Sequence, residues 1–430
     1  MKQTWLFAAL SFASLLAGCG QADPTPAPPQ MASVDRLDAE LRAQFEAELE
    51  NLRQRHRIPG MSVAVVRDQE VVYARGFGYA DLEREIPATE DTPCNIASCT
   101  KPIAATVLMQ LVEAGQLDLD VPMADVLKDT VFPYRSLGQE SRGYAAFCRG
   151  VKEIAHDTAS PLAPAFSALY GDYRCDIERI TVRHHLTHTS EGVPGESYRY
   201  SGDLYMLLTY VAERVAAKSF ADLLVDSIVR PLDMTQTVPS ISAAHRDWAM
   251  ADLAQYYRAH DGDFVLSQYP PEETLEALQA AGMDEFFPQV AEGQRVLLPL
   301  SAAAGMISTV LDLAKFDVAV DDNVLVSEVT KEAMWTPSRS KSGEPLPYGL
   351  GWFVQSVEGT RLIWHYGYAP GAYSSLILKV PSDNLTLILL ANSDGLSAGF
   401  NLGRAPNADS VLKSPFALAF LDLFTTLEFE

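Results

Sequence analysis

The stretch Cys94–Gln116, CNIASCTKPIAATVLMQLVEAGQ, decides the architecture because it joins a reactive pair of side chains to a strongly apolar helix. Ser98 and Lys101 stand three positions apart, so on a helix they share one face, where a hydroxyl and an amine can exchange a proton. Apolar residues then recur at helical spacing, which predicts a buried helix ending near Gly115. The stretch therefore predicts a nucleophile beside a base on a rigid support.

Lys101 can serve as a base only if its pKa lies below the ordinary lysine range. Burial, the positive end of the helix dipole, a neighbouring cation and the absence of an acid in the next turn would each favour the neutral amine. Cys99 is a rival nucleophile, but it is rotated about 100° from Ser98 around the helix, and we expect a buried structural thiol. A second SxxK pattern, Ser338–Lys341, lies among Pro and Gly residues, and we interpret it as solvated surface.

The size and charge of the chain limit its class. It has 430 residues, 48% of them hydrophobic, which predicts a globular protein, with two domains favoured over one. The formal net charge of −23 argues against binding to nucleic acid, because phosphate backbones carry the same sign. We expect the acidic surface to serve solubility.

The first residues predict export and lipid anchoring. Residues 1–18 have a basic start and an apolar run that is too short to span a bilayer, as in a secretory signal. The end of this run, LAGC at 16–19, resembles the lipobox of bacterial lipoproteins, which implies cleavage before Cys19 and acylation there. Residues 19–33 would be a Pro-rich tether. We expect a cell-envelope protein facing the periplasm, at the outer membrane because Gly20 follows the cysteine. An ordinary secreted protein is the alternative.

Four further cysteines, at 94, 99, 148 and 175, allow three disulfide pairings outside the cytoplasm. We favour Cys148 with Cys175, because they bracket an irregular segment. No CxxC or His–Cys cluster has metal-ligand spacing, and the histidines around His188 fit no usual zinc motif. We therefore predict no metal and no other cofactor, and a structural hydrogen-bonding role for His188.

The secondary-structure pattern predicts an α/β (α+β) fold: an antiparallel sheet built from both chain ends and flanked by helices, plus an all-helical second domain. The expected domain parts are 34–97, 98–298 and 299–430, the middle one mainly helical with irregular insertions. From 128 to 176 the pattern dissolves into Gly, Pro and polar residues, which indicates either a lid that shapes a pocket or a surface elaboration without catalytic consequence. Segment 240–295 resists assignment. The expected strands are 61–66, 71–77, 348–355, 361–366, 372–380 and 385–391. The expected helices include 34–57, 203–217, 220–234 and 412–427.

Three elements then follow one another as in a known family. SCTK at 98–101, YSG at 200–202 and HYG at 365–367 resemble, in order and spacing, the motifs of class C β-lactamases and penicillin-binding-protein-like serine hydrolases. Supporting stretches match as well: LTHTS at 186–190, PLDM at 231–234, AAGMIST at 303–309 and YGLGW at 348–352. The resemblance runs from about residue 35 to 395 and implies the β-lactamase/transpeptidase-like fold.

The resemblance implies a mechanism that the side chains can perform. Ser98 would attack an acyl carbon to give an acyl-enzyme, while Lys101 and Tyr200 carry the proton. Lys101 should favour the Tyr200 phenolate and lower its pKa. The backbone amides of Ser98 and Tyr368 would hold the oxyanion, and Gly367 would let its strand pass close to the substrate.

Two departures from the family pattern bear on the substrate. His365 replaces a lysine that would anchor a substrate carboxylate, and Gly202 replaces an asparagine that would contact substrate and Lys101. Both changes resemble the esterase and D-aminopeptidase branches, so we predict a small-molecule ester, amide or D-peptide as substrate and weak or absent lactamase activity. The alternatives are a D-alanyl-D-alanine carboxypeptidase or β-lactamase, and a catalytically weak binding or structural module.

Overall fold

The protein is represented by a computed structural model, which describes residues 34–132, 141–156, 173–267, 299–397 and 410–427. The signal-like segment, the lipobox with Cys19 and the Pro-rich tether lie outside the described residues.

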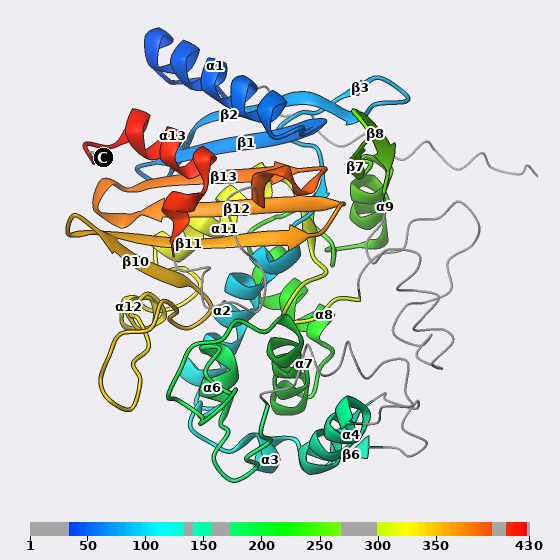
Figure 1. Ribbon diagram of the computed structural model, residues 1–430, viewed down its shortest axis with the longest axis vertical. Helices are drawn as coiled ribbons and strands as arrows, with labels where there is room; N and C mark the ends of the chain where they lie inside the picture. Colours follow the sequence, from blue (N-terminus) through cyan, green and yellow to red (C-terminus); the bar gives the residue numbers. More distant parts are fainter. Residues whose placement is uncertain (1–33, 133–140, 157–172, 268–298, 398–409, 428–430) are drawn as a thin grey trace, which may run out of the picture.

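One seven-stranded antiparallel sheet dominates the structure, in the order β10-β11-β12-β13-β1-β2-β3 (Figure 1). The N-terminal part of the chain gives β1 (Gly60–Arg67), β2 (Glu70–Asp81) and β3 (Ile86–Pro87). The C-terminal part gives β10 (Phe353–Val357), β11 (Thr360–Ala369), β12 (Tyr373–Val380) and β13 (Leu385–Ala391). The two parts meet where β1 pairs with β13, from Met61 opposite Ala391 to Arg67 opposite Leu385. The predicted α/β fold with a sheet built from both chain ends is confirmed.

The start of β10 corrects one predicted strand. The expected strand 348–355 begins only at Phe353, because Gly349 N–H bonds to the Trp352 carbonyl in a turn. Gly351 in this turn has φ +87°, and a Cβ there would lie 2.3 Å from the Ala105 side chain. A glycine fits because the turn presses directly on α2, the helix that follows the nucleophile.

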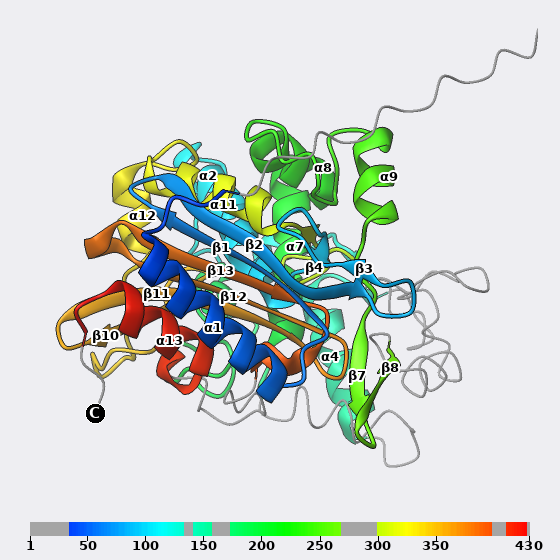
Figure 2. The ribbon, with the colours of Figure 1, turned by 90° about the horizontal axis from the view of Figure 1, so that it is seen from above.

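Two helices cover one face of the sheet. The first, α1 (Ala39–Arg55), and the last, α13 (Pro415–Phe424), lie side by side on it (Figure 2). Phe45 of α1 packs edge-on against Phe424 of α13, with ring centroids 4.9 Å apart. The apolar side chains buried on this face hold α1 and α13, near the two ends of the chain, against the same sheet.

The opposite face packs against α2 (Thr100–Glu113) and α11 (Val310–Asp321). The Lys379 amine on β12 pairs with the carboxylates of Asp317 and Asp321 on α11, and the first two side chains are almost fully buried. The core on this face continues without interruption into the helical region, so the predicted domain boundaries remain predictions.

The helical region lies beside the sheet and contains α3 (Met123–Val126), α4 (Tyr144–His156), α6 (Val182–Leu186), α7 (Gly202–Ala216), α8 (Phe220–Leu224) and a π-helical turn (Val225–Val229). Further elements are α9 (Ala243–Ala251), α12 (Glu328–Met334), and the strand pairs β4–β9 (Cys94–Asn95 with Ile307–Ser308), β5–β6 (Val131–Phe132 with Ser141–Arg142) and β7–β8 (Tyr257–His260 with Asp263–Leu266). Within their described residues, segment 128–176 contributes the β5–β6 pair and α4, and segment 240–295 contributes α9 and the β7–β8 hairpin. None of the helices in the described ranges is long and apolar enough to span a bilayer.

Candidate active site

The predicted nucleophile and base lie together at the start of α2. Ser98 occupies a short 3-10 turn, η1 (Ala97–Cys99), which runs directly into the helix. The Thr100 hydroxyl donates to the Ala97 carbonyl at 2.7 Å and fixes this turn. Lys101 Nζ lies 2.9 Å from Ser98 Oγ. The structure thus brings together the two groups that the SxxK spacing predicted.

Burial makes Lys101 a base. Its side chain is 0% exposed, and burial lowers the pKa of its amine to about 7, against opposing effects of Asp203 and the Cys99 thiol. The sequence prediction considered acids only along the same helix. Asp203 approaches from α7 instead, yet burial dominates. Near neutral pH a substantial fraction of Lys101 is therefore unprotonated.

The backbone of Ala303 supplies the second partner of Lys101, with the amine 3.0 Å from its carbonyl oxygen. The β4–β9 pair brings this loop to the nucleophile, because Asn95 lies opposite Ile307. Gly305 has φ +107°, and a Cβ there would lie 2.7 Å from Leu300 Cα. The AAGMIST stretch at 303–309 carries no local signal that the Ala303 carbonyl contacts Lys101.

Tyr200 lies over the catalytic pair. The Lys101 amine is 4.9 Å from the centre of its ring. The residue as a whole is partly exposed, whereas its hydroxyl oxygen is shielded from solvent and has no hydrogen-bond partner of good geometry among the described residues. Burial raises the pKa of Tyr200 well above its usual value, and the Ser98 hydroxyl acts in the opposite direction. The predicted lowering of the Tyr200 pKa by Lys101 is therefore wrong, and Tyr200 remains a phenol.

His188 packs against Tyr200. The two ring centroids lie 4.3 Å apart, and the Ser201 N–H donates to His188 Nδ1 at 3.2 Å. Burial keeps the pKa of His188 well below its usual value. This geometry agrees with the structural hydrogen-bonding role predicted for His188, and it adds an aromatic contact that the sequence did not suggest.

His365 is fully buried on β11, and internal partners occupy both of its ring nitrogens. The Tyr348 hydroxyl lies 2.9 Å from Nε2, and Nδ1 lies 2.8 Å from the Tyr366 carbonyl oxygen. A carbonyl oxygen can only accept, so Nδ1 carries the proton and Nε2 accepts from Tyr348. Burial lowers the pKa of His365 well below its usual value. The third motif thus presents a neutral, internally bonded ring.

Gly367 permits a close approach of β11 to the turn that carries Ser98, and its predicted passage beside the substrate stays a prediction. A Cβ at this position would lie 2.2 Å from Ser375 Oγ and 2.3 Å from the carbonyl oxygen of Ile96. The glycine therefore lets β11 pack against the turn that carries Ser98. Tyr368 follows on β11, partly buried. The pairing of β10 with β11 ends at Trp364, so no described strand continues along this edge. The oxyanion role of the Ser98 and Tyr368 amides stays a prediction.

Gly202, the first residue of α7, faces Lys101 with space to spare. A Cβ at this position would lie 4.0 Å from Lys101 Nζ and would meet nothing closer. The side chain that the family pattern would place here is missing, and its space is open. The Ser98 and Ala303 oxygens are the hydrogen-bond partners that Lys101 retains.

The cysteines have structural positions. Cys99 is fully buried, donates to the His365 carbonyl, and burial raises its pKa to about 12, as expected for a structural thiol. The structure shows the four cysteines after residue 33 as thiols rather than as disulfides. Cys148 nevertheless contacts Cys175, which is the pair that the sequence favoured.

The clustered histidines diverge to separate partners: His184 to Thr181, His185 to Tyr144 and Tyr173, and His188 to Ser201. Within the described ranges, no group of three His, Cys, Asp or Glu residues is placed to hold a metal ion.

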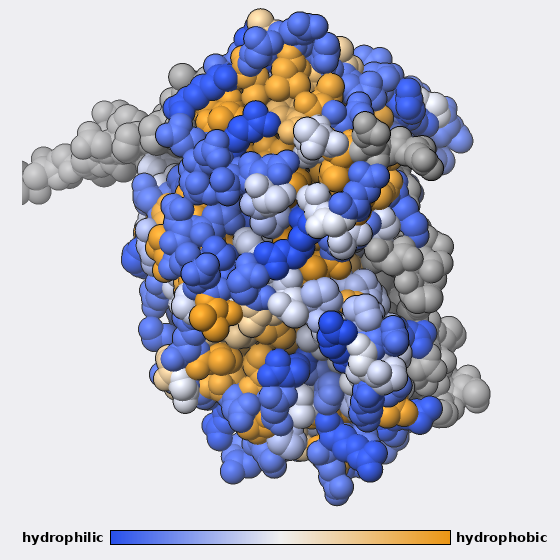
Figure 3. All heavy atoms as spheres, turned by 90° about the vertical axis from the view of Figure 1, so that its left-hand side faces the viewer, coloured by the Kyte–Doolittle hydropathy of each residue, from blue (hydrophilic) through white to orange (hydrophobic). Residues whose placement is uncertain are grey.

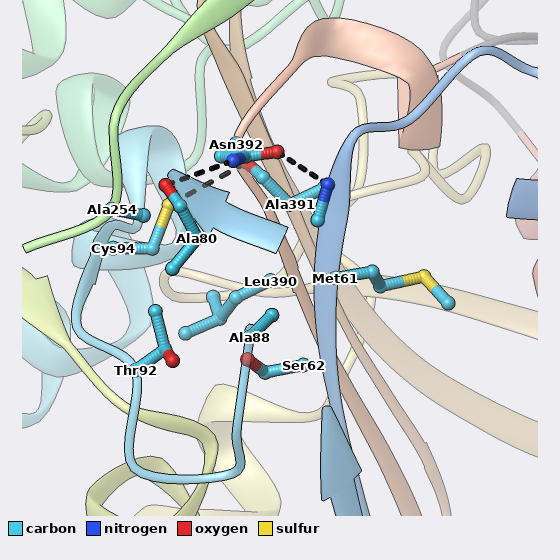
Figure 4. A pocket seen from close by; sticks show the side chains of 11 residues that line it. Met61, Ser62, Ala80, Ala88, Thr92, Cys94, Ala254, Leu390, Ala391 and Asn392 are labelled. Carbon is cyan, nitrogen blue, oxygen red and sulfur yellow. Dashed lines mark hydrogen bonds between the residues drawn. The ribbon is translucent and has the colours of Figure 1, made fainter. Parts of the chain in front are cut away.

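The structure has a wide groove and a small cavity near the sheet, which differ greatly in volume. A groove of about 680 Å³ lies between the loop that leads to Tyr200 and the loop that leads to Tyr348, lined among others by Glu196, Tyr198 and Glu344. Figure 3 shows this side of the molecule, where hydrophilic residues surround separate apolar patches. A second cavity, between the ends of β1 and β13 near Cys94, has a volume of about 10 Å³ (Figure 4). It has space for one water molecule at most, so it is no substrate site.

A serine paired with a buried lysine one turn later, beneath a tyrosine and beside an antiparallel sheet, defines a class of serine acyl-transfer hydrolases. Residues 45–409 match the Beta-lactamase family, and the chain belongs to this family. "Penicillin-binding protein 4*" of Bacillus subtilis (strain 168) is 25% identical, with 82% of this chain and 72% of that protein covered. "Protein flp" of Staphylococcus aureus (strain MW2) is also 25% identical, over 83% of this chain and 64% of that protein.

Solved structures share the fold at lower identity. The octameric penicillin-binding protein homologue from Pyrococcus abyssi is 22% identical with a TM-score of 0.59, covering 89% of this chain and 78% of that one. EstCE1, a hydrolase with promiscuous acyltransferase activity, is 17% identical with a TM-score of 0.57, covering 89% and 98%. The D-amino acid amidase from Ochrobactrum anthropi SV3 is 20% identical with a TM-score of 0.55, covering 83% and 92%.

Proposed function

We propose that the protein hydrolyses small esters or D-amino-acid amides that carry no carboxylate near the reacting carbonyl, through an acyl-enzyme on Ser98. The 2.9 Å contact between Lys101 Nζ and Ser98 Oγ, with the amine fully buried, carries this proposal. A neutral amine at this distance can accept the serine proton as the oxygen attacks.

The proton balance of the reaction follows from the two pKa shifts. As the Ser98 oxygen bonds to the acyl carbon, its proton passes to neutral Lys101 and the carbonyl oxygen becomes an oxyanion. Tyr200, which remains a phenol, donates its proton to the leaving alkoxide or amine and recovers one from the Lys101 ammonium. The oxyanion collapses as the leaving group departs. Water then attacks the Ser98 ester with Lys101 again as base, and the proton on Lys101 returns to the Ser98 oxygen as the acid is released.

The third motif, HYG at 365–367, is evidence that the substrate carries no carboxylate near the reacting carbonyl. A lysine at position 365 would offer a fixed positive charge, whereas His365 is neutral and uses both ring nitrogens internally. Gly202 removes a second polar group that would face the substrate side of Lys101. EstCE1 and the D-amino acid amidase, by their names a hydrolase with acyltransferase activity and an amidase, share this fold and fit the same chemistry.

A substrate panel tests the proposal. Purified protein is assayed with p-nitrophenyl acetate and butyrate, D-alanine and D-phenylalanine amides, a peptide ending in D-Ala-D-Ala, and a chromogenic cephalosporin, beside Ser98→Ala. We expect turnover of the first two groups only, abolished in the variant. Selective release of terminal D-alanine would favour the carboxypeptidase alternative, and no turnover of any substrate by folded protein would favour the binding module.

We also propose that the mature protein is anchored in the cell envelope through lipid on Cys19, facing the periplasm. The LAGC sequence at 16–19 and the Pro-rich tether after it support this proposal. Expression in a two-membrane bacterium, with mass spectrometry of the amino-terminal peptide, tests it. We expect a diacylglyceryl-modified Cys19 in the membrane fraction, and release of Cys19→Ser into the soluble fraction. An unmodified amino terminus would contradict the proposal.

A further inference from the structure

Tyr348 and His365 form a hydrogen-bonded pair that the mechanism above does not use. Tyr348 lies in the turn before β10, His365 lies on β11, and both side chains are fully buried. The hydroxyl of Tyr348 donates to Nε2, and Nδ1–H donates to the carbonyl of Tyr366. With both nitrogens engaged, the ring has one tautomer and one orientation.

The strand that carries His365 is also tied to the nucleophile turn. The Cys99 thiol, next to Ser98, donates to the His365 carbonyl at 3.5 Å. Two residues further along β11, the backbone of Gly367 packs against the Ile96 carbonyl, which also accepts from the Ser375 hydroxyl at 2.7 Å. A shift of the His365 ring would therefore move the strand that touches both sides of the Ser98 turn.

We propose that Tyr348 is a positioning residue: its hydroxyl holds His365 as the neutral Nδ1–H tautomer and thereby holds β11 in place against the turn that carries Ser98. The same hydrogen bond occupies Nε2 of His365. If Nε2 took a proton instead, the His365 ring would become a second cation beside Lys101. The consequence for turnover rests on the proposed function, whereas the state of His365 does not.

The groups around His365 favour its neutral form. Lys101 of α2 is the cation that faces it, and the charge of Lys101 lowers the pKa of His365 further. The other titratable groups packed around the ring are the buried phenols of Tyr348, Tyr200 and Tyr366, the Cys99 thiol and the His188 ring. Burial holds all of these groups in their neutral forms, so none of them offsets the charge of Lys101.

Nitrogen NMR of the ligand-free protein tests the pair directly. In protein labelled with ¹⁵N-histidine, with His365→Gln to assign the signals, we expect a protonated Nδ1 and a non-protonated, hydrogen-bonded Nε2. These signals should stay constant between about pH 6 and pH 8, across the range where an ordinary histidine titrates. A His365 ring that carries its proton on Nε2, or that titrates near its usual pKa, would overturn the proposal.

Tyr348→Phe then tests the consequence, with Tyr73→Phe as the matched control, because Tyr73 is equally buried and its hydroxyl bonds to Glu46 away from the site. Loss of the donor to the neutral ring should raise the pKa of His365 and add a second ionisation to the acid limb of kcat/KM. We expect kcat for the ester to fall roughly tenfold with KM nearly unchanged, since displaced catalytic geometry acts on the chemical step.

The outcomes separate the two proposals. An unchanged kcat and unchanged His365 signals in Tyr348→Phe, or an equal loss in Tyr73→Phe, would overturn the positioning role. If no ester or amide is turned over, the rate of Ser98 labelling by a fluorophosphonate replaces kcat as the readout. If Tyr348→Phe does not fold, the NMR signals of the unaltered protein decide alone.

Discussion

The amine of Lys101 lies 2.9 Å from the hydroxyl oxygen of Ser98, in a position with no access to solvent. Burial disfavours the charged amine, and Asp203 only partly opposes this effect. A lysine that would be protonated in water at pH 7 is therefore poised to accept the serine proton.

The first prediction concerns the pH dependence of turnover. The pKa of Lys101 is lowered to about 7, so the amine is neutral above that value and protonated below it. We expect kcat/KM for an uncharged ester to be highest above about pH 8 and to fall roughly tenfold per pH unit below about pH 6. A steady-state pH profile with p-nitrophenyl acetate measures this. Activity that is flat from pH 5 to 8 would exclude Lys101 as the base.

The second prediction concerns the hydroxyl of Tyr200. Tyr200→Phe removes the group that carries the proton to the leaving group, so kcat should fall by about 100-fold to 10,000-fold. Its melting temperature should stay near that of the unaltered protein, because the hydroxyl has no hydrogen-bond partner of good geometry in the described structure. Steady-state kinetics and thermal unfolding measure both. Tyr210→Phe, on the far part of α7, should keep its activity, and full activity in Tyr200→Phe would remove the residue from the mechanism.

The third prediction restores a side chain at position 202. Gly202→Asn would place an amide beside Lys101, because a Cβ at this position would lie 4.0 Å from the amine. We expect faster acylation of Ser98 by a labelled penicillin and a lower KM for D-amino-acid amides. Gly202→Ala adds only the methyl group and should leave both values unchanged. An equal response in the two variants would show that the amide has no such role.

The fourth prediction concerns the packing of β11 on the nucleophile turn. Gly367→Ala would force a methyl group to within 2.3 Å of the Ile96 carbonyl, so the strand or the turn must move. We expect a loss of about 1–3 kcal/mol in unfolding free energy, together with loss of nearly all turnover. Urea unfolding and ester kinetics measure the two effects. A fully active and stable variant would show that β11 does not constrain Ser98.

The fifth prediction concerns the buried ion pair between α11 and the sheet. Lys379→Met leaves Asp317 buried without its partner and should lower the unfolding free energy by about 3–5 kcal/mol. Turnover per folded molecule should not change, because this pair lies away from Ser98. Adding Asp317→Leu should recover much of the stability. A single variant as stable as the unaltered protein would show that the pair is dispensable.

Local sequence patterns predicted the parts of the site that depend on short-range geometry. The SxxK spacing at Ser98 needs only one helical turn, and closely spaced β-rich runs separated by turns were enough to predict the antiparallel sheet. Tyr200 was predicted as a site residue from the order of the three motifs. Hydrophobic periodicity alone does not show that it lies near Ser98. The start of β10 was missed because a tight turn at Gly351 interrupts an apolar run.

The remaining features depend on contacts between distant segments. Nothing near Ala303 in the sequence indicates that its carbonyl faces Lys101, and Asp203 approaches from another helix. The pKa of Tyr200 was predicted in the wrong direction because burial outweighs the neighbouring amine. The hydrogen bond between Tyr348 and His365 could not be predicted, because nothing in either sequence motif indicates that the two side chains meet in the folded structure.

Covalent labelling of the nucleophile tests the central claim most directly. Protein is treated with a fluorophosphonate at about pH 8, where neutral Lys101 can activate Ser98, and the adduct is located by intact-mass and peptide mass spectrometry. We predict a single adduct on Ser98, absent from Ser98→Ala and formed far more slowly by Lys101→Met. An adduct on Cys99 or Ser338, or no adduct on folded protein, would contradict the account.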